Sequence, residues 1–484
     1  MNDPIRRLSV VALILFMALM GTATWIQVLN AGSLNDDPRN VRTLYREYGT
    51  YRGPIVVDGE SVASSKEVDD SYGFQRTYSL GPVYAPITGF YSIVYGRTGL
   101  EQSENTLLNG TSDALFWSRL GDLFAGEEQQ GASVETTIDA DLQQAAYDAL
   151  GDHAGAVVAL DPSTGAIKAM VSTPSYDPNL LASHSTSEVN EAYAELVGDE
   201  DQPMLNRAIA QTYPPGSVFK LVVAAAALED GYDEDSLIEA PKVLELPQTS
   251  ATLSNYGGSS CDTDADGNTT LSDALRVSCN TAFANLGMDL GWDAIEDMAI
   301  DLGFEQSIDV PLTTASSQLP DDPNEPQTAQ SSIGQFDVRS TPIQMAMVAA
   351  AIANDGELMT PYLVDSVRSN SLQVIDTTEQ SVFSTPFSSD TASALTDMMI
   401  SVVEDGSGRS AQISGVEIAG KTGTAETGTD DPPYTWFVAF APADDPEIAI
   451  AVLVEDGGVG ATGGSVAAPI GKQVLQAALS GGDD

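Results

Sequence analysis

The chain has 484 residues, of which 42% are apolar and 19% are charged. Seventy acidic residues against twenty basic ones give a formal net charge of −50 at pH 7, which repels the phosphate backbone of nucleic acids. The composition therefore excludes a low-complexity chain and argues against a nucleic-acid partner, and the length predicts about two or three domains with hydrophobic cores.

An apolar segment near the N-terminus predicts one membrane anchor. Arg6 and Arg7 precede an uncharged run over residues 8–29, long enough to cross a hydrocarbon core of about 30 Å as a helix. The two arginines predict that residues 1–7 are cytoplasmic and that the chain after the anchor is extracytoplasmic. A cleaved signal peptide is the alternative, because small residues occupy positions 21–23. We expect an uncleaved single-pass anchor, since the apolar run continues beyond those residues.

Residues 30–133 are expected to form a small extracytoplasmic module. Short strand-like runs such as residues 53–57 alternate there with prolines and with turn formers. A change follows at Val134, where an alternating run over residues 134–138 predicts a strand and Asp139 predicts the N-cap of a helix. We expect a second, larger domain over residues 134–484.

Strand patterns at both ends of this second domain enclose a helical middle. Hairpins are predicted over residues 155–171 and 436–454, each with turn formers at its centre. Helical patterns cover residues 271–286, 342–353, 392–403 and 467–479. The order predicts an α+β domain whose antiparallel sheet joins strands that are distant in the sequence.

Two cysteines and two histidines limit the available chemistry. Cys261 and Cys279 are compatible with one disulfide outside the cytoplasm, and a pair of free thiols is the alternative. His153 and His184 are too few for a three-histidine metal site and give little support for a Ser-His-Asp triad. We expect no metal or cofactor, and a residue other than histidine to carry the proton.

Ser217 and Lys220 offer such a proton carrier. If Ser217 opens a helix, residues three apart share one face and the hydroxyl can meet the amine. A buried lysine near another cation loses part of its preference for the charged form, so its neutral amine can accept the proton of the serine. Alone, Ser-x-x-Lys occurs often by chance and equally fits a helix cap followed by a solvated lysine.

Two further motifs follow in a recognised order. Ser278-Cys279-Asn280 lies 61 residues after Ser217, and a Lys-Thr-Gly-Thr sequence at residues 421–424 begins a strand-like run 143 residues later. Ser-x-x-Lys, Ser-x-Asn and Lys-Thr-Gly together are typical of serine β-lactamases and penicillin-binding proteins. The combination predicts acyl transfer through a serine nucleophile.

Each motif residue has an expected role in that chemistry. Ser217 attacks, Lys220 accepts its proton, and Ser278 passes a proton to the leaving group. The other residues bind substrate: Asn280 holds an amide, Lys421 attracts an anionic end, Thr422 and Thr424 offer hydroxyls, and Gly423 lets a substrate strand lie close. The backbone N–H groups of Ser217 and Thr424 are the expected oxyanion hole.

With these motifs the chain resembles the class B penicillin-binding proteins, and most of all the actinobacterial penicillin-binding protein A type. Further similar segments lie at residues 40–42, 52–55, 99–101, 137–139 with 142–143, 160–165, 175–179, 334–335 with 341–346, 353–356 and 436–440. The resemblance implies the serine transpeptidase fold, in which helices flank an antiparallel sheet of about five strands, preceded here by the small module and the anchor.

The resemblance also implies a function. A peptidoglycan D,D-transpeptidase acylates its serine with a stem peptide ending in D-Ala-D-Ala, releases the terminal D-alanine and passes the acyl group to an amine, and β-lactams acylate the same serine. Residues 30–133 are too few for a glycosyltransferase domain. A membrane glycan polymerase and proteins of division or elongation are therefore expected partners, with a role in cell division and shape.

Three other functions are compatible with parts of the pattern. A D,D-carboxypeptidase or β-lactamase uses the same motifs but hands the acyl group to water, and the module before the catalytic domain argues against it. A penicillin sensor would favour more membrane spans and a cytoplasmic output domain. A scaffold with dispensable chemistry would still support growth after Ser217→Ala.

An acidic loop has most of the residue spacing of a calcium-binding loop. Residues 262–267 supply carboxylates at positions 1, 3 and 5 and glycine at position 6, with Asp273 at position 12. Position 12 usually holds a bidentate glutamate, and Asp273 equally well caps the start of the next helix. We expect no metal there; a Cys261–Cys279 disulfide would instead pin this loop beside the segment that carries Ser278.

Overall fold

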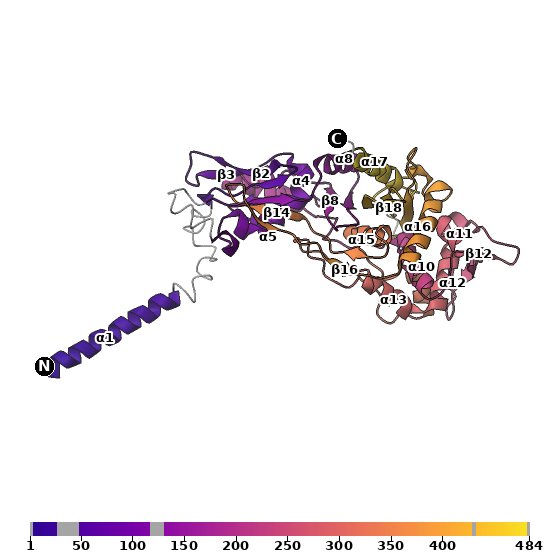
Figure 1. The fold of residues 1–484 in the computed structure, drawn as a ribbon, viewed down its shortest axis with the longest axis horizontal. Helices are drawn as coiled ribbons and strands as arrows, with labels where there is room; N and C mark the ends of the chain where they lie inside the picture. Colours follow the sequence, from indigo (N-terminus) through magenta and orange to yellow (C-terminus); the bar gives the residue numbers. More distant parts are fainter. Residues whose placement is uncertain (1–2, 27–47, 117–129, 428–431, 482–484) are drawn as a thin grey trace.

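The computed structural model describes residues 3–26, 48–116, 130–427 and 432–481, and an N-terminal helix extends away from the rest of them (Figure 1). This helix, α1 (Asp3–Thr24), is long and apolar enough to cross a membrane. It starts before the predicted anchor and includes Arg6 and Arg7. Residues 27–29 of the predicted anchor, and the family-like segment at residues 40–42, lie outside the described residues.

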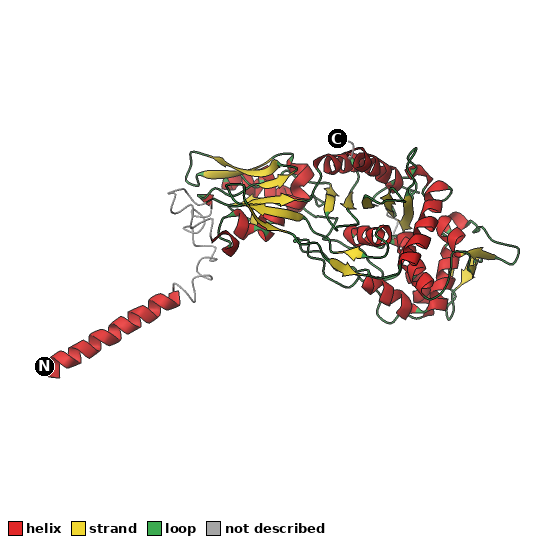
Figure 2. Ribbon diagram, viewed as in Figure 1, coloured by secondary structure: helices red, strands yellow, loops and turns green. Residues whose placement is uncertain are grey.

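A six-stranded sheet organises the part of the molecule nearest α1 (Figure 2). Its strands, in spatial order, are β15 (Val374–Thr377), β14 (Val364–Arg368), β6 (Ser133–Thr136), β1 (Ile55–Val57), β2 (Glu60–Glu67) and β3 (Phe74–Tyr78). β6 runs parallel to β1 and antiparallel to β14. The sheet therefore recruits two strands, β14 and β15, from far along the chain. β6, which begins the predicted second domain, also belongs to this sheet rather than to the five-stranded sheet of the catalytic motifs.

The second sheet is antiparallel and has five strands. Their order is β17 (Ala419–Ala425), β18 (Tyr434–Ala441), β19 (Ile448–Val454), β7 (Gly155–Leu160) and β8 (Ile167–Thr173). The two hairpins form where the sequence predicts them, and β19 joins one to the other. β17 is left as an edge strand.

Helices cover both faces of this sheet, which confirms the predicted α+β arrangement. On one face α8 (Ala140–Leu150) and α17 (Ala467–Ser480) pack against a layer that includes Phe437 and Val452. On the other face α15 (Pro342–Ala353) packs on β7 and β19, and Trp436 and Val438 point into that larger core. Alternate residues of each central strand thus enter opposite cores, as expected for a sheet buried on both sides.

A helical lobe adjoins the second of these cores (Figure 1). It contains α10 (Lys220–Glu229), α11 (Leu271–Arg276), α12 (Asn280–Leu290), α13 (Trp292–Asp301), α14 (Glu325–Ser331) and α16 (Ser389–Glu404). The remaining helices and turns are α4 (Gly81–Thr88), α5 (Gly99–Ser103), α6 (Asn105–Leu108), η2 (Asp113–Leu115), η3 (Pro178–Leu180), α9 (Thr186–Gly198), η4 (Gly216–Phe219), η5 (Tyr256–Gly258) and η6 (Arg409–Ala411). The short strands are β4 (Tyr91–Ser92), β5 (Gly96–Arg97), β9 (Leu237–Glu239), β10 (Val243–Glu245), β11 (Thr252–Ser254), β12 (Asn268–Thr270), β13 (Leu358–Met359) and β16 (Val382–Ser384).

The predicted helix over residues 271–286 is wrong in one respect, because the structure breaks it into α11 and α12. The chain turns at Ser278, whose φ of 60° lies in the left-handed region that most residues avoid. Thr270 caps the first piece with its side chain. The break moves Ser278 off the helix and presents both its hydroxyl and its carbonyl to one side.

A buried ion cluster ties the start of the N-terminal module together. Glu101 is fully buried and accepts hydrogen bonds from Nε of Arg52 at 2.5 Å, Nε of Arg76 at 2.6 Å and the hydroxyl of Tyr78 at 3.2 Å. Burial alone raises the pKa of the Glu101 carboxyl, but Arg76 and Arg52 outweigh it and bring the pKa below its ordinary value. The charged carboxylate therefore stabilises the folded module.

We predict that Glu101→Gln lowers the free energy of unfolding by about 3–5 kcal/mol, because it leaves two buried guanidinium groups without their counter-charge. Since the pKa of Glu101 is lower in the folded state, this stabilisation is present above the unfolded-state pKa and is lost as the pH falls. Thermal unfolding of both proteins at neutral pH measures the difference. The exposed Glu67→Gln is the control, and equal midpoints for Glu101→Gln and the wild type would contradict the prediction.

Candidate active site

Ser217 lies on a short turn, η4, between the sheet edge and helix α10. The preceding Gly216 has a φ of 55°, and a Cβ atom there would approach the carbonyl oxygen of Thr424 to 2.8 Å. Only glycine permits this close approach without strain. The Gly216 N–H donates to the Gly334 carbonyl at 2.9 Å, and Trp436 Nε1 donates to the Pro214 carbonyl at 3.0 Å. These contacts hold the half-buried Ser217 beside the edge strand β17.

Lys220 is completely buried at the first position of α10. Its Nζ lies 2.8 Å from the carbonyl oxygen of Ser278, 2.8 Å from Oδ1 of Asn280 and 3.3 Å from Oγ of Ser278, all within hydrogen-bond distance. The ring of Phe283 lies 5.4 Å from the same nitrogen. Ser278 and Asn280 of the Ser-x-Asn motif thus both contact the amine of Lys220, the lysine of the Ser-x-x-Lys motif.

Lys421 approaches Ser278 from the opposite side. It is completely buried on β17, and its Nζ donates to Oγ of Ser278 at 2.9 Å and to the carbonyl of Thr422 at 3.0 Å. The Ser278 hydroxyl therefore stands between two lysine amines that are 201 positions apart in the sequence. The three motifs meet at this one oxygen.

The surroundings lower the pKa of both amines. Burial, and secondly the positive charge of Lys421, hold the pKa of Lys220 well below its ordinary value. Burial alone lowers the pKa of Lys421 to about 7. The pair therefore favours a neutral Lys220, a state in which the amine accepts a proton rather than donating one.

The substrate-binding residues predicted on β17 line the free edge of the five-stranded sheet. A Cβ on Gly423 would lie 2.9 Å from the Pro215 carbonyl, so this glycine permits the strand to pass close to the Ser217 segment. The Thr422 hydroxyl shares a hydrogen bond of 2.5 Å with the Ser407 hydroxyl, and Oγ1 of Thr424 accepts the Gly463 N–H at 3.1 Å.

The sequence predicts that the Ser217 hydroxyl meets the amine of Lys220, but the structure shows no hydrogen bond between them. Among the described residues this hydroxyl forms no hydrogen bond, either to Lys220 or to Ser278, although η4 places it at the same site. The amine of Lys220 is instead occupied by Ser278 and Asn280. Catalytic hydrogen bonds are often long in ligand-free enzymes and tighten when the substrate binds.

The structure pairs Cys261 with Cys279, with their Cα atoms 5.8 Å apart. The disulfide fixes the residue between Ser278 and Asn280 to the acidic loop. Asp262 of that loop and Asp273 of α11 both accept hydrogen bonds from Arg276, at 2.6 and 2.8 Å. Within the part of the chain that the structure describes, no group of three acidic, histidine or cysteine side chains is arranged to hold a metal ion.

Sequence reasoning missed several supporting residues. Oδ1 of Asn255, a buried side chain after β11, accepts the N–H groups of Asn280 at 2.8 Å and Thr281 at 3.2 Å, and so caps the start of α12. Ser407 and Trp436 likewise contact motif residues, as described above. None of them belongs to a motif of fixed spacing, and only the fold brings them to the site.

Comparison with known families matches most of the described chain to two models. Residues 155–476 match the penicillin binding protein transpeptidase domain, and residues 52–134 match the penicillin binding protein A dimerisation domain. The first region contains all three motifs. The second contains strands β1, β2 and β3 of the six-stranded sheet and the first two residues of β6, but not β14 or β15.

Individual proteins and structures agree with these families. The chain is 46% identical over the full length of both proteins to the peptidoglycan D,D-transpeptidase PbpA of Mycolicibacterium smegmatis. It is 30% identical to the peptidoglycan D,D-transpeptidase MrdA of Acinetobacter baumannii, over 78% of this chain and 59% of that protein. The ceftriaxone acyl-enzyme of penicillin-binding protein A from Mycobacterium tuberculosis, 44% identical, superposes with a TM-score of 0.87 over 90% of this chain and 100% of that one.

Proposed function

The chain belongs to the penicillin-binding protein A type of class B penicillin-binding proteins and is a peptidoglycan D,D-transpeptidase, and we propose that Ser217 is its nucleophile. The single observation that carries the assignment is the position of Lys220, a buried amine with a lowered pKa one turn from Ser217. The relative from Mycobacterium tuberculosis forms acyl-enzymes with ceftriaxone, imipenem and penicillin G.

In the acylation step Oγ of Ser217 attacks the carbonyl carbon between the two terminal D-alanines of the stem peptide. Its proton passes to the neutral amine of Lys220. The carbonyl oxygen becomes an oxyanion, which the backbone N–H groups of Ser217 and Thr424 stabilise. The close approach of Gly216 to Thr424 supports this pairing, because it holds the two backbones side by side.

Ser278 then completes the proton transfer. Its hydroxyl is hydrogen-bonded to both lysine amines, so it can receive a proton from Lys220 while giving its own to the departing amine. The peptide C–N bond breaks, D-alanine leaves, and the acyl group remains on Ser217. An acceptor amine attacks this ester in the reverse sense, returning a proton through Ser278 and Lys220 and restoring the Ser217 hydroxyl.

The edge strand β17 binds the donor peptide as an additional strand. Lys421 supplies positive potential near the terminal carboxylate, and the hydroxyls of Thr422 and Thr424 donate to it. Asn280 positions the substrate amide while its Oδ1 holds Lys220. The Ser407 hydroxyl extends this group of donors through Thr422.

We further propose that α1 anchors the enzyme with its N-terminus in the cytoplasm, supported by Arg6 and Arg7 at its first turns. The catalytic domain then faces the peptidoglycan outside the membrane. Stem peptides ending in D-Ala-D-Ala and β-lactams are its small partners. A membrane glycan polymerase and division or elongation proteins are its expected protein partners.

We predict that benzylpenicillin adds one covalent adduct to the full-length protein, detected by intact-mass analysis, and that peptide mapping places it on Ser217. Ser217→Ala should abolish the adduct, whereas Ser163→Ala, an exposed serine of the β7–β8 turn, should retain it. An adduct on another residue, or one that survives Ser217→Ala, would overturn the site assignment. Release of D-alanine with transfer to an added amine, rather than to water, separates the transpeptidase from a hydrolase.

We also predict that the second-order rate constant for acylation by an anionic penicillin falls by at least about tenfold in total as the pH rises through about 7 and then levels off, because a hydrogen bond to a charged group is worth about 1.5–3 kcal/mol. Lys421 is charged below its pKa of about 7 and neutral above it, so the attraction for the carboxylate is lost as the pH rises. Stopped-flow acylation across the pH range measures this. The uncharged methyl ester of the same penicillin is the matched control, and its acylation rate constant should not show this fall with rising pH. An equal fall for both compounds would refute this role of Lys421.

A further inference from the structure

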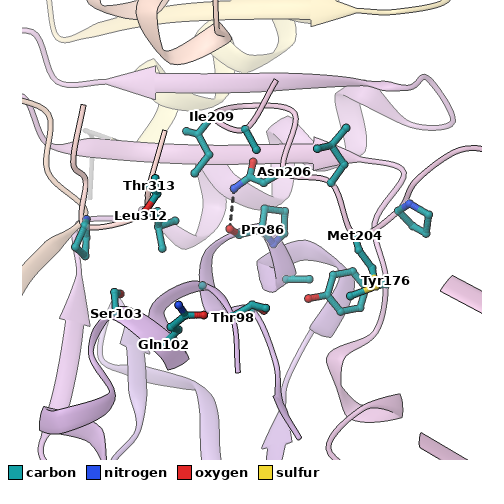
Figure 3. A pocket seen from close by; sticks show the side chains of 17 residues that line it. Pro86, Thr98, Gln102, Ser103, Tyr176, Met204, Asn206, Ile209, Leu312 and Thr313 are labelled. Atoms are coloured by element: carbon teal, nitrogen blue, oxygen red, sulfur yellow. Dashed lines mark hydrogen bonds between the residues drawn. The ribbon is translucent and has the colours of Figure 1, made fainter. Parts of the chain in front are cut away.

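A cavity of about 570 Å³ lies between the N-terminal module and the transpeptidase domain, and none of the residues that line it belongs to the three catalytic motifs (Figure 3). Its volume is within the range of small-molecule sites, roughly 300–1,000 Å³. Thr98, Gln102 and Ser103 line it from the module, and Asn206, Ile209 and Leu312 face them from the transpeptidase domain. A ligand here would contact both parts of the protein at once.

The lining of the cavity carries no charge. None of its 17 residues is Asp, Glu, Lys, Arg or His, although 19% of the chain is charged and its net charge is −50. A charged ligand would find no counter-charge in this lining to compensate for the hydration it loses there. The occupant that this lining favours is therefore uncharged.

The polar groups of the lining are hydroxyls and carboxamides. Within the described ranges the side chains of Gln102, Ser103 and Thr313 make no intramolecular hydrogen bond, so their donors and acceptors are available to a ligand. Asn206, by contrast, is fixed by donating to the Pro86 carbonyl at 2.8 Å. The ring of Tyr176 and several aliphatic side chains provide apolar surface. This combination suits a ligand with hydroxyl groups, amides and apolar faces.

The wall of the cavity continues directly into the nucleophile segment. Residues 203–206, 209 and 210 form part of the lining, and the chain then reaches Ser217 through Tyr213. Within this stretch Nε of Arg207 donates to Oε1 of Glu455 at 3.0 Å, and the Tyr213 hydroxyl donates to the same oxygen at 2.6 Å. A ligand against this wall would therefore bind to a segment that is clamped in turn to the end of β19.

We propose that this cavity binds the glycan portion of peptidoglycan, through an uncharged N-acetylated disaccharide. The choice of glycan rests on the proposed function: the stem peptide is charged and is taken by β17, whereas the N-acetylated amino sugars of the strand are neutral and carry the hydroxyl and amide groups that the lining matches. The cavity holds the sugar strand while the active site holds its peptide.

The test uses the full-length protein in detergent with N,N′-diacetylchitobiose, which has no stem peptide and cannot serve as a donor. Calorimetric titration should detect saturable binding. Cellobiose has the same two-ring skeleton without acetamides, and it should bind at least about tenfold more weakly, because at least two hydrogen bonds are lost. No binding of diacetylchitobiose, or equal binding of cellobiose, would overturn the proposal.

A cavity-blocking variant locates the binding. Ala210 lines the cavity and is exposed, so Ala210→Trp should fill it and weaken diacetylchitobiose binding by at least about tenfold. Ala194→Trp, at an exposed position of α9 outside the lining, is the matched control and should bind normally. Unchanged binding to Ala210→Trp would refute the location.

Penicillin acylation of each variant reports separately on the fold and the active site. Ala210→Trp should still be acylated by benzylpenicillin at Ser217, which shows that the loss of sugar binding is local. If penicillin labels a residue other than Ser217 while the sugar binds as predicted, the catalytic assignment fails and the glycan site stands. If Ser217 is labelled and the sugar does not bind, only the glycan site fails.

Discussion

Two buried lysine amines share one serine hydroxyl, and the catalytic proposal depends on this arrangement. Oγ of Ser278 accepts from Nζ of Lys220 at 3.3 Å and from Nζ of Lys421 at 2.9 Å. Burying two ammonium groups so close together is costly, and the cost falls when one of them gives up its proton. The fold thus creates a neutral amine beside a serine, the task that a histidine performs in other acyl-transfer enzymes. In the proposed mechanism this neutral amine is the general base.

The fold brings three segments that are distant in the sequence to the Ser278 hydroxyl. α10 begins with Lys220, the break between α11 and α12 exposes Ser278, and the edge strand β17 carries Lys421. Close backbone contacts at glycine positions keep the segments in register, and the disulfide at Cys279 with the cap from Asn255 fixes the middle one. Because β17 is an edge strand, a substrate peptide can pair with it at the point where these segments converge.

Much of the fold and of the candidate site was predictable from the sequence, because the chemistry requires particular residue types in a particular order. The three motifs, the two hairpins and the helix at Pro342–Ala353 follow from local pattern. The break at Ser278 was not predictable, since residues 271–286 have a continuous helical pattern and tertiary contacts with both lysines favour the left-handed turn. Likewise β14 and β15 join β6 through pairing over a long separation, and the roles of Asn255 and Ser407 depend on that global fold rather than on any spacing in the sequence.

The protonation of Lys220 is the most direct test of the account. NMR titration of protein carrying ¹³C-labelled lysine, with the Lys220 signal assigned by Lys220→Arg, measures its pKa in the free enzyme. The account predicts a pKa well below the ordinary value of 10.5, and a rise when Lys421→Met removes the neighbouring charge. A Lys220 that titrates at the ordinary value, or one that does not respond to the loss of Lys421, would contradict the claim that burial and a second lysine prepare the base.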